Sequence, residues 1–391
     1  MRLDPEIHAE LDARLAAVDM RLSSRYPGDP DSRQPVHTVY VPADRFHQGL
    51  VPEWGGAALR SLSSAPALPY PESLHARVTA KLADEPIEDL RIDFEDGYGI
   101  RADDEEDAAA TSAAKALAGA EVTPPFVGLR VKSMESHTRR RSLRTLDVFL
   151  DAWFGGAAEL PANLVVTLPK VSDPAQVDAF AAVCGRLDAA YGIALRFEIQ
   201  IETPAAVLGA DGTATVARMI TAADGRCTGL HYGTYDYSAA CGIGAAYQSM
   251  DHPAADHAKA VMQVAAAGTG VRLSDGSTNV LPVGTDDQVA AAWALHARLV
   301  RRSLERGFYQ GWDLHPAQLP TRYAATYAFF RDGAAAARDR LAAYLDRRDT
   351  GILDEPATAR ALAGFLLRGL RCGALDDGEL GDLTADRLAG L

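Results

Sequence analysis

Three carboxylates crowd the end of one apolar run in the first quarter of the chain. Asp93, Glu95 and Asp96 follow Ile92, and a glycine-rich turn at 97–99 comes next. Carboxylates packed this closely repel one another unless a cation lies among them. Other apolar runs also end in charged residues, at Arg130, Lys170, Glu202 and Asp236. A series of charges at strand ends predicts the rim of one active site.

The elements that must position these charges alternate along the chain. Short β-rich runs lie at 37–41, 90–94, 126–131, 164–168, 195–201, 229–234, 279–283 and 310–314. Alanine-rich segments with helical spacing separate most of them, for example at 107–118, 174–191, 213–223 and 286–306. Alternating strands and helices predict an α/β protein with a parallel sheet. Eight repeats suit a closed (β/α)8 TIM barrel, whose active site lies where the strands end.

The barrel is expected to span residues 36–320 as the catalytic domain, between two helical appendages. Residues 1–35 combine a helical pattern with a loop rich in proline, glycine and aspartate, so we expect an N-terminal helical extension. Residues 321–391 have helical patterns at 321–347 and 355–369. This C-terminal segment either packs on the barrel or reaches another subunit.

The composition argues against several classes of protein. The 391 residues are 48% hydrophobic, which supports a substantial core. A formal net charge of -14 repels nucleic acid and anionic membranes over most of the surface, so an anionic ligand needs a local basic pocket. The sequence shows no apolar signal core and no run of the roughly 20 apolar residues that a membrane span needs. We therefore expect a cytoplasmic protein.

The acidic run at 103–107 has two interpretations. It could collect a metal, or it could begin a helix, where carboxylates satisfy free amides and suit the helix dipole. We favour the helix start, because Asp103 and Glu106 have the spacing of a capping box.

The order of the motifs resembles that of the citrate lyase β-subunit-like branch of the HpcH/HpaI aldolase family, within the phosphoenolpyruvate/pyruvate-type barrels. The matching pieces lie at 40–43, 93–96, 129–131, 168–170, 201–204, 233–236, 314–318 and 353–356. Each piece is weak alone, but the shared order is strong. The resemblance implies a Mg2+-dependent lyase that makes or breaks a carbon-carbon bond beside a carbonyl, often with a coenzyme A (CoA) thioester as one partner.

The resemblance places Glu202 and Asp236 as the protein ligands of Mg2+, or of Mn2+. A hard divalent cation takes oxygen ligands, is held by one or two carboxylates, and leaves positions for substrate and water. Asp93, Glu95 and Asp96 would form an outer shell that orients bound water and offsets the charge of the ion. The alternative is that these carboxylates only close their strands, with Asp93 capping the turn at 97–99.

Arg130 matches the family's clamp for a substrate carboxylate, and a planar guanidinium suits a two-point grip on a 2-oxo acid. The alternative is an ion pair with Glu95 or Asp96 on the adjacent strand. Cleavage beside a carbonyl pushes electrons onto an oxygen, and a coordinated metal would stabilise the resulting enolate. We therefore assign Arg130 and Asp96 to the catalytic set, with Glu95 in contact with the substrate.

The reaction also moves a proton between the hydroxyl being cleaved and the carbon being released, which requires an acid/base. Asp354 matches an aspartate that members of this family present to a neighbouring subunit for this transfer. This role predicts a homo-oligomer, a trimer or a hexamer. The alternative is that Asp354 caps the helix that begins near Pro356, and the two roles can coexist.

Lys170 and His315 are further candidates for contacts with the substrate. A desolvated lysine at a strand end could form a Schiff base with a ketone, but the surrounding carboxylates favour Lys170 as the charge partner of the acidic rim. His315 begins the turn 315–318, where a structural hydrogen bond is favoured over a general base.

The sequence leaves the substrate open. The motif at 93–96 and the segment 235–237 also resemble those of malate synthases, and a basic cluster, Arg139, Arg140, Arg141 and Arg144, could hold the phosphates of CoA or form a solvated helix face. The competing reactions are cleavage of a 3-hydroxyacyl-CoA, aldol cleavage of a free 4-hydroxy-2-oxo acid and a malate-synthase-like condensation. A catalytically inactive binding barrel is the remaining alternative.

Overall fold

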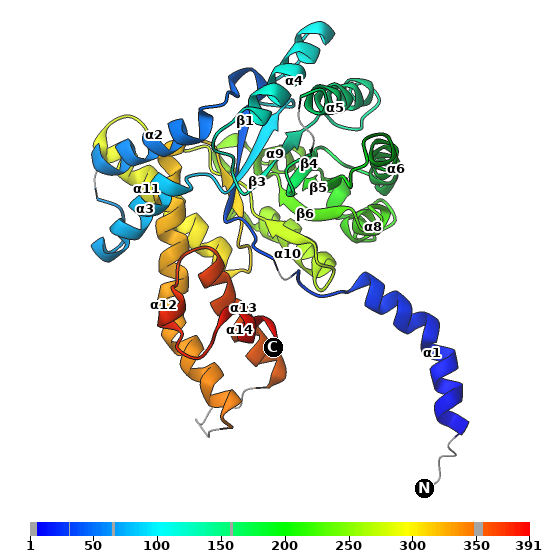
Figure 1. Cartoon of the computed structure of the whole chain (residues 1–391), viewed down its shortest axis with the longest axis vertical. Coiled ribbons are helices and arrows are strands. Elements are labelled where there is room, and N and C mark those ends of the chain that lie inside the picture. Colours follow the sequence, from blue (N-terminus) through cyan, green and yellow to red (C-terminus); the bar gives the residue numbers. More distant parts are fainter. Residues whose placement is uncertain (1–5, 31, 65–66, 157–158, 348–354) are drawn as a thin grey trace.

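The computed structural model describes residues 6–30, 32–64, 67–156, 159–347 and 355–391. Eight parallel strands form a nearly closed barrel, so the predicted fold is confirmed (Figure 1). Neighbouring strands follow chain order from β1 to β7, and β8 pairs with β1 on its other side. A bridge between Ser274 and Gln310 joins the two remaining edges. The strands are β1 His37–Pro42, β2 Asp89–Asp93, β3 Phe126–Arg130, β4 Leu164–Leu168, β5 Arg196–Ile201, β6 Cys227–Tyr232, β7 Arg272–Ser274 and β8 Gly311–Asp313.

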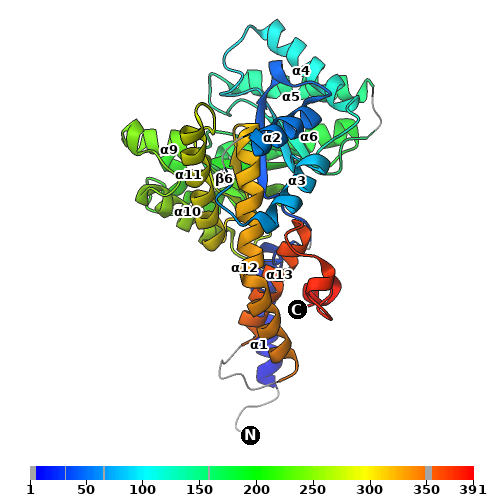
Figure 2. The same cartoon turned by 90° about the vertical axis from the view of Figure 1, so that its left-hand side faces the viewer.

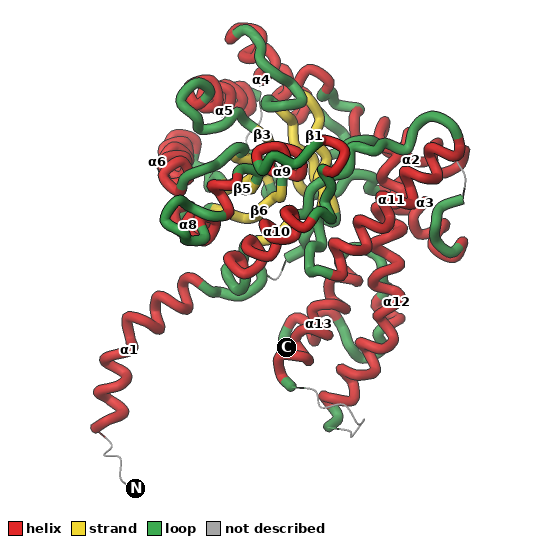
Figure 3. The backbone as a smooth tube through the Cα atoms, turned by 180° about the vertical axis from the view of Figure 1, so that it is seen from behind, coloured by secondary structure: helices red, strands yellow, loops and turns green. Residues whose placement is uncertain are grey.

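Helices surround the strands (Figure 3). They are α1 Glu6–Arg25, α2 Leu50–Ser64, α3 His75–Asp84, α4 Asp103–Ala118, α5 Arg139–Phe154, α6 Pro174–Tyr191, α7 Pro204–Val207, α8 Thr215–Ala222, α9 Thr234–Ala240, α10 Pro253–Ala266, α11 Asp286–Glu305, α12 Leu319–Leu345, α13 Pro356–Arg371 and α14 Ala385–Ala389. Helix α1 projects away from the barrel and buries none of its residues (Figure 1). Helix α12 runs from the barrel to α13 (Figure 2). Within the described ranges, no helix has both the length and the apolar character needed to cross a bilayer.

The seventh strand lies earlier than the sequence pattern predicted. The apolar run at 279–283 is a loop after β7, and Val280 and Val283 are 46% and 50% exposed. The actual strand, Arg272–Ser274, is short and mixed in polarity, so it leaves no apolar signature. The sixth strand also ends before the predicted boundary, at Tyr232. Asp236 therefore lies on α9 rather than at the strand end itself.

The acidic run after Ala102 begins α4 as predicted, with acids in the first turn, but the predicted capping box is wrong. Ala102 is the N-cap, and no side chain caps this end of the helix. Glu106 is instead buried and accepts hydrogen bonds from Lys132 Nζ and Thr145 Oγ1, both at 2.6 Å. Glu106 therefore links α4 to Lys132, which follows β3, and to Thr145 on α5.

The interior of the barrel contains a connected group of buried ionisable residues. Arg91 on β2 donates to Asp89 on the same strand and to both oxygens of Glu198 on β5, at 2.9 and 3.0 Å. His231 Nε2 lies 2.8 Å from Glu198 Oε2 as well. All four residues are buried. Buried charges persist only when each one has a partner, so Arg91 holds the two carboxylates inside the barrel.

Replacing Arg91 tests this role. We expect Arg91→Met to lower the free energy of unfolding by roughly 3–5 kcal/mol, because Asp89 and Glu198 lose their buried partner. Urea denaturation followed by circular dichroism measures the change. Arg140→Met, on the exposed face of α5, is the matched control and should change little. A loss below about 1 kcal/mol in Arg91→Met would show that the two carboxylates do not depend on Arg91.

Candidate active site

Charged side chains from three separate strand ends meet at one lysine ammonium. Lys170 Nζ lies 2.9 Å from Glu95 Oε1 and 2.9 Å from Asp96 Oδ2. It also lies 3.1 Å from Asp236 Oδ2. Lys170 follows β4, the residues 95 and 96 follow β2, and Asp236 lies on α9 after β6. The carboxyl ends of the strands thus bring together the charges that the sequence placed on one rim.

Glu202 joins this group from the end of β5 and is buried. Its Oε1 accepts a hydrogen bond from the backbone N–H of Lys170 at 2.7 Å. To donate this bond, Lys170 adopts φ 52°, a left-handed backbone conformation that is strained for a residue other than glycine. A Cβ at Gly233 would lie 2.4 Å from Glu202 Cβ, so the glycine leaves the space that Glu202 occupies.

The electrostatics of the group show an excess of negative charge. Burial raises the pKa of Glu202 to about 7; Lys170 opposes the shift, while Glu95 and Asp236 add to it. Burial would lower the pKa of Lys170, but Glu202 and Glu95 outweigh it and hold that pKa well above its usual value. One ammonium therefore does not neutralise the carboxylates around it, and a second cation would be stabilised here.

Arg130 makes its two-point grip with a carboxylate of the protein. Its Nε and Nη2 donate to the two oxygens of Asp93 at 2.6 and 2.7 Å, because the sheet register pairs these residues directly. Its Nη1 lies 3.5 Å from Glu95 Oε2, close to the predicted alternative, and the guanidinium stacks 4.7 Å from the centre of the Tyr40 ring. Asp93 also accepts from the backbone N–H of Gly97, as its predicted capping role requires.

His315 and Asp354 complete the predicted set of site residues. His315 Nδ1 accepts a hydrogen bond from the Ala317 N–H at 3.1 Å and caps the short helix Pro316–Gln318, which is the structural role favoured from the sequence. Among the described residues, no hydrogen bond or ion pair links His315 to the carboxylates. Asp354 lies outside the described residues, so its role as acid/base stays a prediction.

Two polar residues at the mouth were missed by sequence reasoning. Gln200 precedes Glu202 by two positions, and its Nε2 lies 3.4 Å from Glu202 Oε2. The Oε1 of Gln200 and the hydroxyl of Tyr40 are buried, and neither has a hydrogen-bond partner among the described residues. Alternation along the strands could have indicated Gln200, because residues two apart share one face.

The donor chemistry suits a hard cation held by a small number of ligands. Among the described residues, no group of three or more His, Cys, Asp or Glu side chains is arranged to hold a metal ion. Mg2+ requires less than that, because one or two carboxylates hold it while substrate and water complete its shell. The partly protonated Glu202 and the half-exposed Asp236 fit this pattern, although the Lys170 ammonium competes with a metal ion for the Asp236 carboxylate.

The fold and this mouth define a (β/α)8 barrel with an acidic site at the carboxyl ends of its strands. The chain belongs to the family described as "Domain of unknown function (DUF6986)", whose model matches residues 15–391. No curated protein matches the chain.

Solved structures share the fold. A citrate lyase from Burkholderia xenovorans LB400 is 21% identical, with a TM-score of 0.59 over 83% of this chain and 98% of that one. CitE from Mycobacterium tuberculosis, in complex with magnesium, acetoacetate and coenzyme A, is 20% identical, with a TM-score of 0.53 over 88% and 100% of the two chains. Malate synthase from Haloferax volcanii is 13% identical, with a TM-score of 0.51 over 88% and 99%. These neighbours agree with the resemblance inferred from the sequence, at the level of the fold.

The raised pKa of Glu202 predicts a pH-dependent stability. Because the folded state holds this proton more tightly, its contribution to stability is fully present below about pH 4.5 and is lost as the pH rises through about 7. Without divalent cations, the free energy of unfolding of Glu202→Gln relative to that of the wild type should therefore rise by on the order of 2–3 kcal/mol between pH 5 and pH 8.

Urea denaturation at both pH values in the presence of a chelator measures this difference. Glu121→Gln, at an exposed position, is the matched control and should follow the wild type. If the stability of Glu202→Gln changed with pH as that of the wild type does, Glu202 would be fully ionised at pH 5 and the excess of negative charge would be absent.

Proposed function

We propose that the protein is a divalent-metal-dependent carbon-carbon lyase that acts on a 2-oxo acid or a 3-hydroxyacyl-CoA and works through an enolate. The observation that carries the proposal is the grouping of four carboxylates around Lys170: Glu95, Asp96 and Asp236 contact its ammonium, and Glu202 accepts a hydrogen bond from its backbone N–H. A metal-dependent lyase needs such an anionic site at the mouth of its barrel.

The proposal gives each side chain a separate task. Glu202 and Asp236 would hold the cation, which when bound stabilises negative charge that develops on a carbonyl oxygen. Glu95 and Asp96, from one turn after β2, would orient water and substrate. The acid/base would be Asp354, delivered from a neighbouring subunit of a homo-oligomer.

The geometry at Arg130 refines the expected clamp. Asp93 accepts from Nε and from one N–H of Nη2, so a substrate carboxylate would meet the remaining N–H groups of Nη1 and Nη2, beside Glu95. The Asp93–Arg130 pair would then fix the guanidinium in place before the substrate binds. Such a pre-formed ion pair lowers the reorganisation needed when the substrate binds.

The charge state of Lys170 argues against imine catalysis. An amine must lose its proton before it attacks a ketone, and the enzymes that use this chemistry lower the pKa of their lysine. Here the carboxylates raise the pKa of Lys170 instead. We assign Lys170 to charge balance and to orienting Glu202 through its backbone N–H.

Condensation is the second candidate, because the fold is shared with both citrate lyase and malate synthase. Both reactions need a stabilised carbanion beside a carbonyl. They differ in whether a CoA thioester is a partner, and CitE was solved with coenzyme A. CoA use is therefore the property that most needs measurement.

A product screen tests the function. The protein with Mg2+ or Mn2+ is incubated with 2-oxo acids including glyoxylate, with and without acetyl-CoA or propionyl-CoA, and new carbon-carbon bonded products are sought by mass. The cleavage direction is followed with 3-hydroxyacyl-CoA and 4-hydroxy-2-oxo acid substrates. We expect turnover that a chelator abolishes and that Glu202→Gln and Asp236→Asn lower by at least about a hundredfold.

Asp354→Asn is the informative companion variant. It should keep Mn2+ binding while turnover falls by roughly 10²–10⁴. Glu121→Gln should keep both. The absence of Mg2+ or Mn2+ binding at about millimolar concentration would contradict the proposal and favour a binding barrel without catalysis.

Competition between Lys170 and the metal gives a further prediction. Lys170→Met removes the ammonium that shares Glu95, Asp96 and Asp236, so Mn2+ should bind at least about tenfold more tightly, while the metal-free protein should melt at a lower temperature. Calorimetric titration and thermal melting measure the two effects. Lys115→Met, at an exposed position on α4, should change neither. Weaker Mn2+ binding in Lys170→Met would show that the lysine supports the metal site rather than competing with it.

A further inference from the structure

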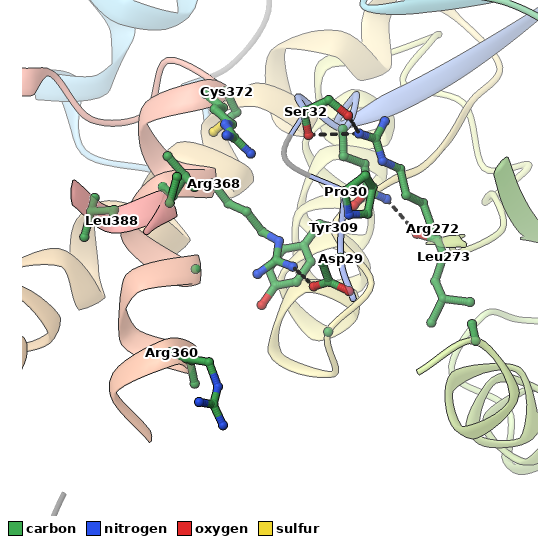
Figure 4. Close-up of a pocket in the computed structure, with 18 of the residues that line it drawn as sticks. Asp29, Pro30, Ser32, Arg272, Leu273, Tyr309, Arg360, Arg368, Cys372 and Leu388 are labelled. Carbon is green, nitrogen blue, oxygen red and sulfur yellow. Dashed lines mark hydrogen bonds and ion pairs between the residues drawn. The ribbon is translucent and has the colours of Figure 1, made fainter. Parts of the chain in front are cut away.

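A cavity lies at the opposite end of the barrel from the acidic mouth. Its volume is about 590 Å³, and α13 forms one of its walls (Figure 4). The barrel residues that line it come before or at the start of strands: Gln34 precedes β1, Arg272 begins β7 and Tyr309 precedes β8. Because the residues of the mouth follow their strands, the two sites are separated by the length of the barrel.

Positive charge gathers in this cavity against the trend of the whole chain. Arg272, Arg360, Arg368 and Arg371 line it, and Asp29 is the one described acidic side chain among the lining residues. The chain as a whole carries a formal charge of -14. Four guanidinium groups at one cavity form the local basic pocket that an anionic ligand requires in such a protein.

Arg272 lacks an ionic partner among the described residues. Its Nη2 donates to the backbone oxygen and the hydroxyl of Ser32 at 2.8 and 2.6 Å, and both acceptors are neutral. Burial lowers the pKa of Arg272, and the nearby Arg371 and Arg368 lower it further. A partly buried cation beside other cations is costly until an anion joins it.

Arg368 approaches from α13, on the other side of the segment that carries Asp29, Pro30 and Ser32 (Figure 4). Its Nη2 donates to Asp29 Oδ2 at 3.0 Å, and Asp29 is itself 74% exposed. An exposed carboxylate paired with an arginine is held weakly. The Asp29 carboxylate therefore shows that an anionic group fits beside Arg368. Its ion pair with Arg368 is weak enough for a ligand to displace it.

The cavity also has an apolar wall. The Arg368 guanidinium stacks 4.5 Å from the centre of the Tyr309 ring, which itself stacks against Phe330. Val271 and Leu367 line the same cavity. A ligand that used the whole space would join a strongly anionic group to an apolar or aromatic body.

We propose that this cavity binds a small organic phosphate, with the phosphate taking the place of the Asp29 carboxylate at Arg368, in the cavity that Arg272 also lines, and the organic body along the apolar wall of Val271, Tyr309 and Leu367. Arginine forks match the oxygens of phosphate, and a phosphate that carries more than one negative charge uses several guanidinium groups at once. The site is distinct from the acidic mouth and does not depend on the proposed lyase activity.

Calorimetric titration of the full chain tests the proposal, in a chelating buffer at low salt. ADP is the probe, and pyrophosphate, adenosine and citrate are the comparisons. We expect ADP to bind more tightly than pyrophosphate, adenosine to show no binding, and binding to weaken as salt rises. Citrate binding as tight as that of ADP would overturn the assignment to phosphate. No binding of ADP at about 1 mM would overturn the site.

Variants locate the binding. Arg272→Gln and Arg368→Gln should each weaken ADP binding by at least about tenfold, and Arg140→Gln, with the same loss of charge at an exposed position, should not. Asp29→Asn should strengthen binding severalfold because it releases Arg368, and it keeps every arginine if the other variants fail to fold.

Glu202→Gln should bind ADP as the wild type does, which separates this site from the proposed active site. Unchanged ADP binding in Asp29→Asn together with Arg272→Gln would overturn the proposal.

Discussion

The excess of negative charge at the mouth of the barrel is the constraint on which the site depends. Carboxylates from the end of β2 and from α9 meet a single ammonium, that of Lys170, and Glu202 at the end of β5 accepts from the backbone N–H of the same residue. The nearest other cation, Arg130, is already balanced by Asp93. Folding therefore leaves the group short of positive charge, and the buried Glu202 responds by keeping its proton up to about pH 7.

The backbone around Glu202 shows that this arrangement is imposed by the surrounding structure. Lys170 adopts a left-handed conformation that places its N–H on Glu202, and residue 233 has no Cβ that would displace the carboxylate. Each feature departs from the local preference of the chain, through strain at one position and lost side-chain packing at the other. Departures from local preference are expected at functional sites, where the position of a side chain matters more than local stability.

Much of the site could be predicted because parallel strands aim their ends at one mouth. The alternation of strands and helices predicted the barrel, and the charges at 95, 96, 170, 202 and 236 followed from it. The pairing of Arg130 could not be predicted in the same way, because the partner of a side chain depends on the register between strands, and that register places Asp93 opposite. A sequence pattern gives the face of a strand but does not give its offset from the next strand.

The errors have physical causes as well. The run at 279–283 has the composition of a strand, yet two of its valines are about half exposed, and the true β7 is held by pairing with β6 rather than by its own apolar residues. Glu106 has the spacing of a capping residue, but its burial beside Lys132 uses its carboxylate elsewhere. In both places tertiary contacts outweighed a local pattern.

The charges of the barrel change sign along its axis. The mouth has too few cations, the interior pairs Arg91 with Asp89 and Glu198, and the opposite end gathers arginines around Arg272. We therefore propose a cation as the ligand of the mouth and an anion as the ligand of the base. The net charge of the whole chain therefore describes neither site, and local charge is the property that predicts what each of them binds.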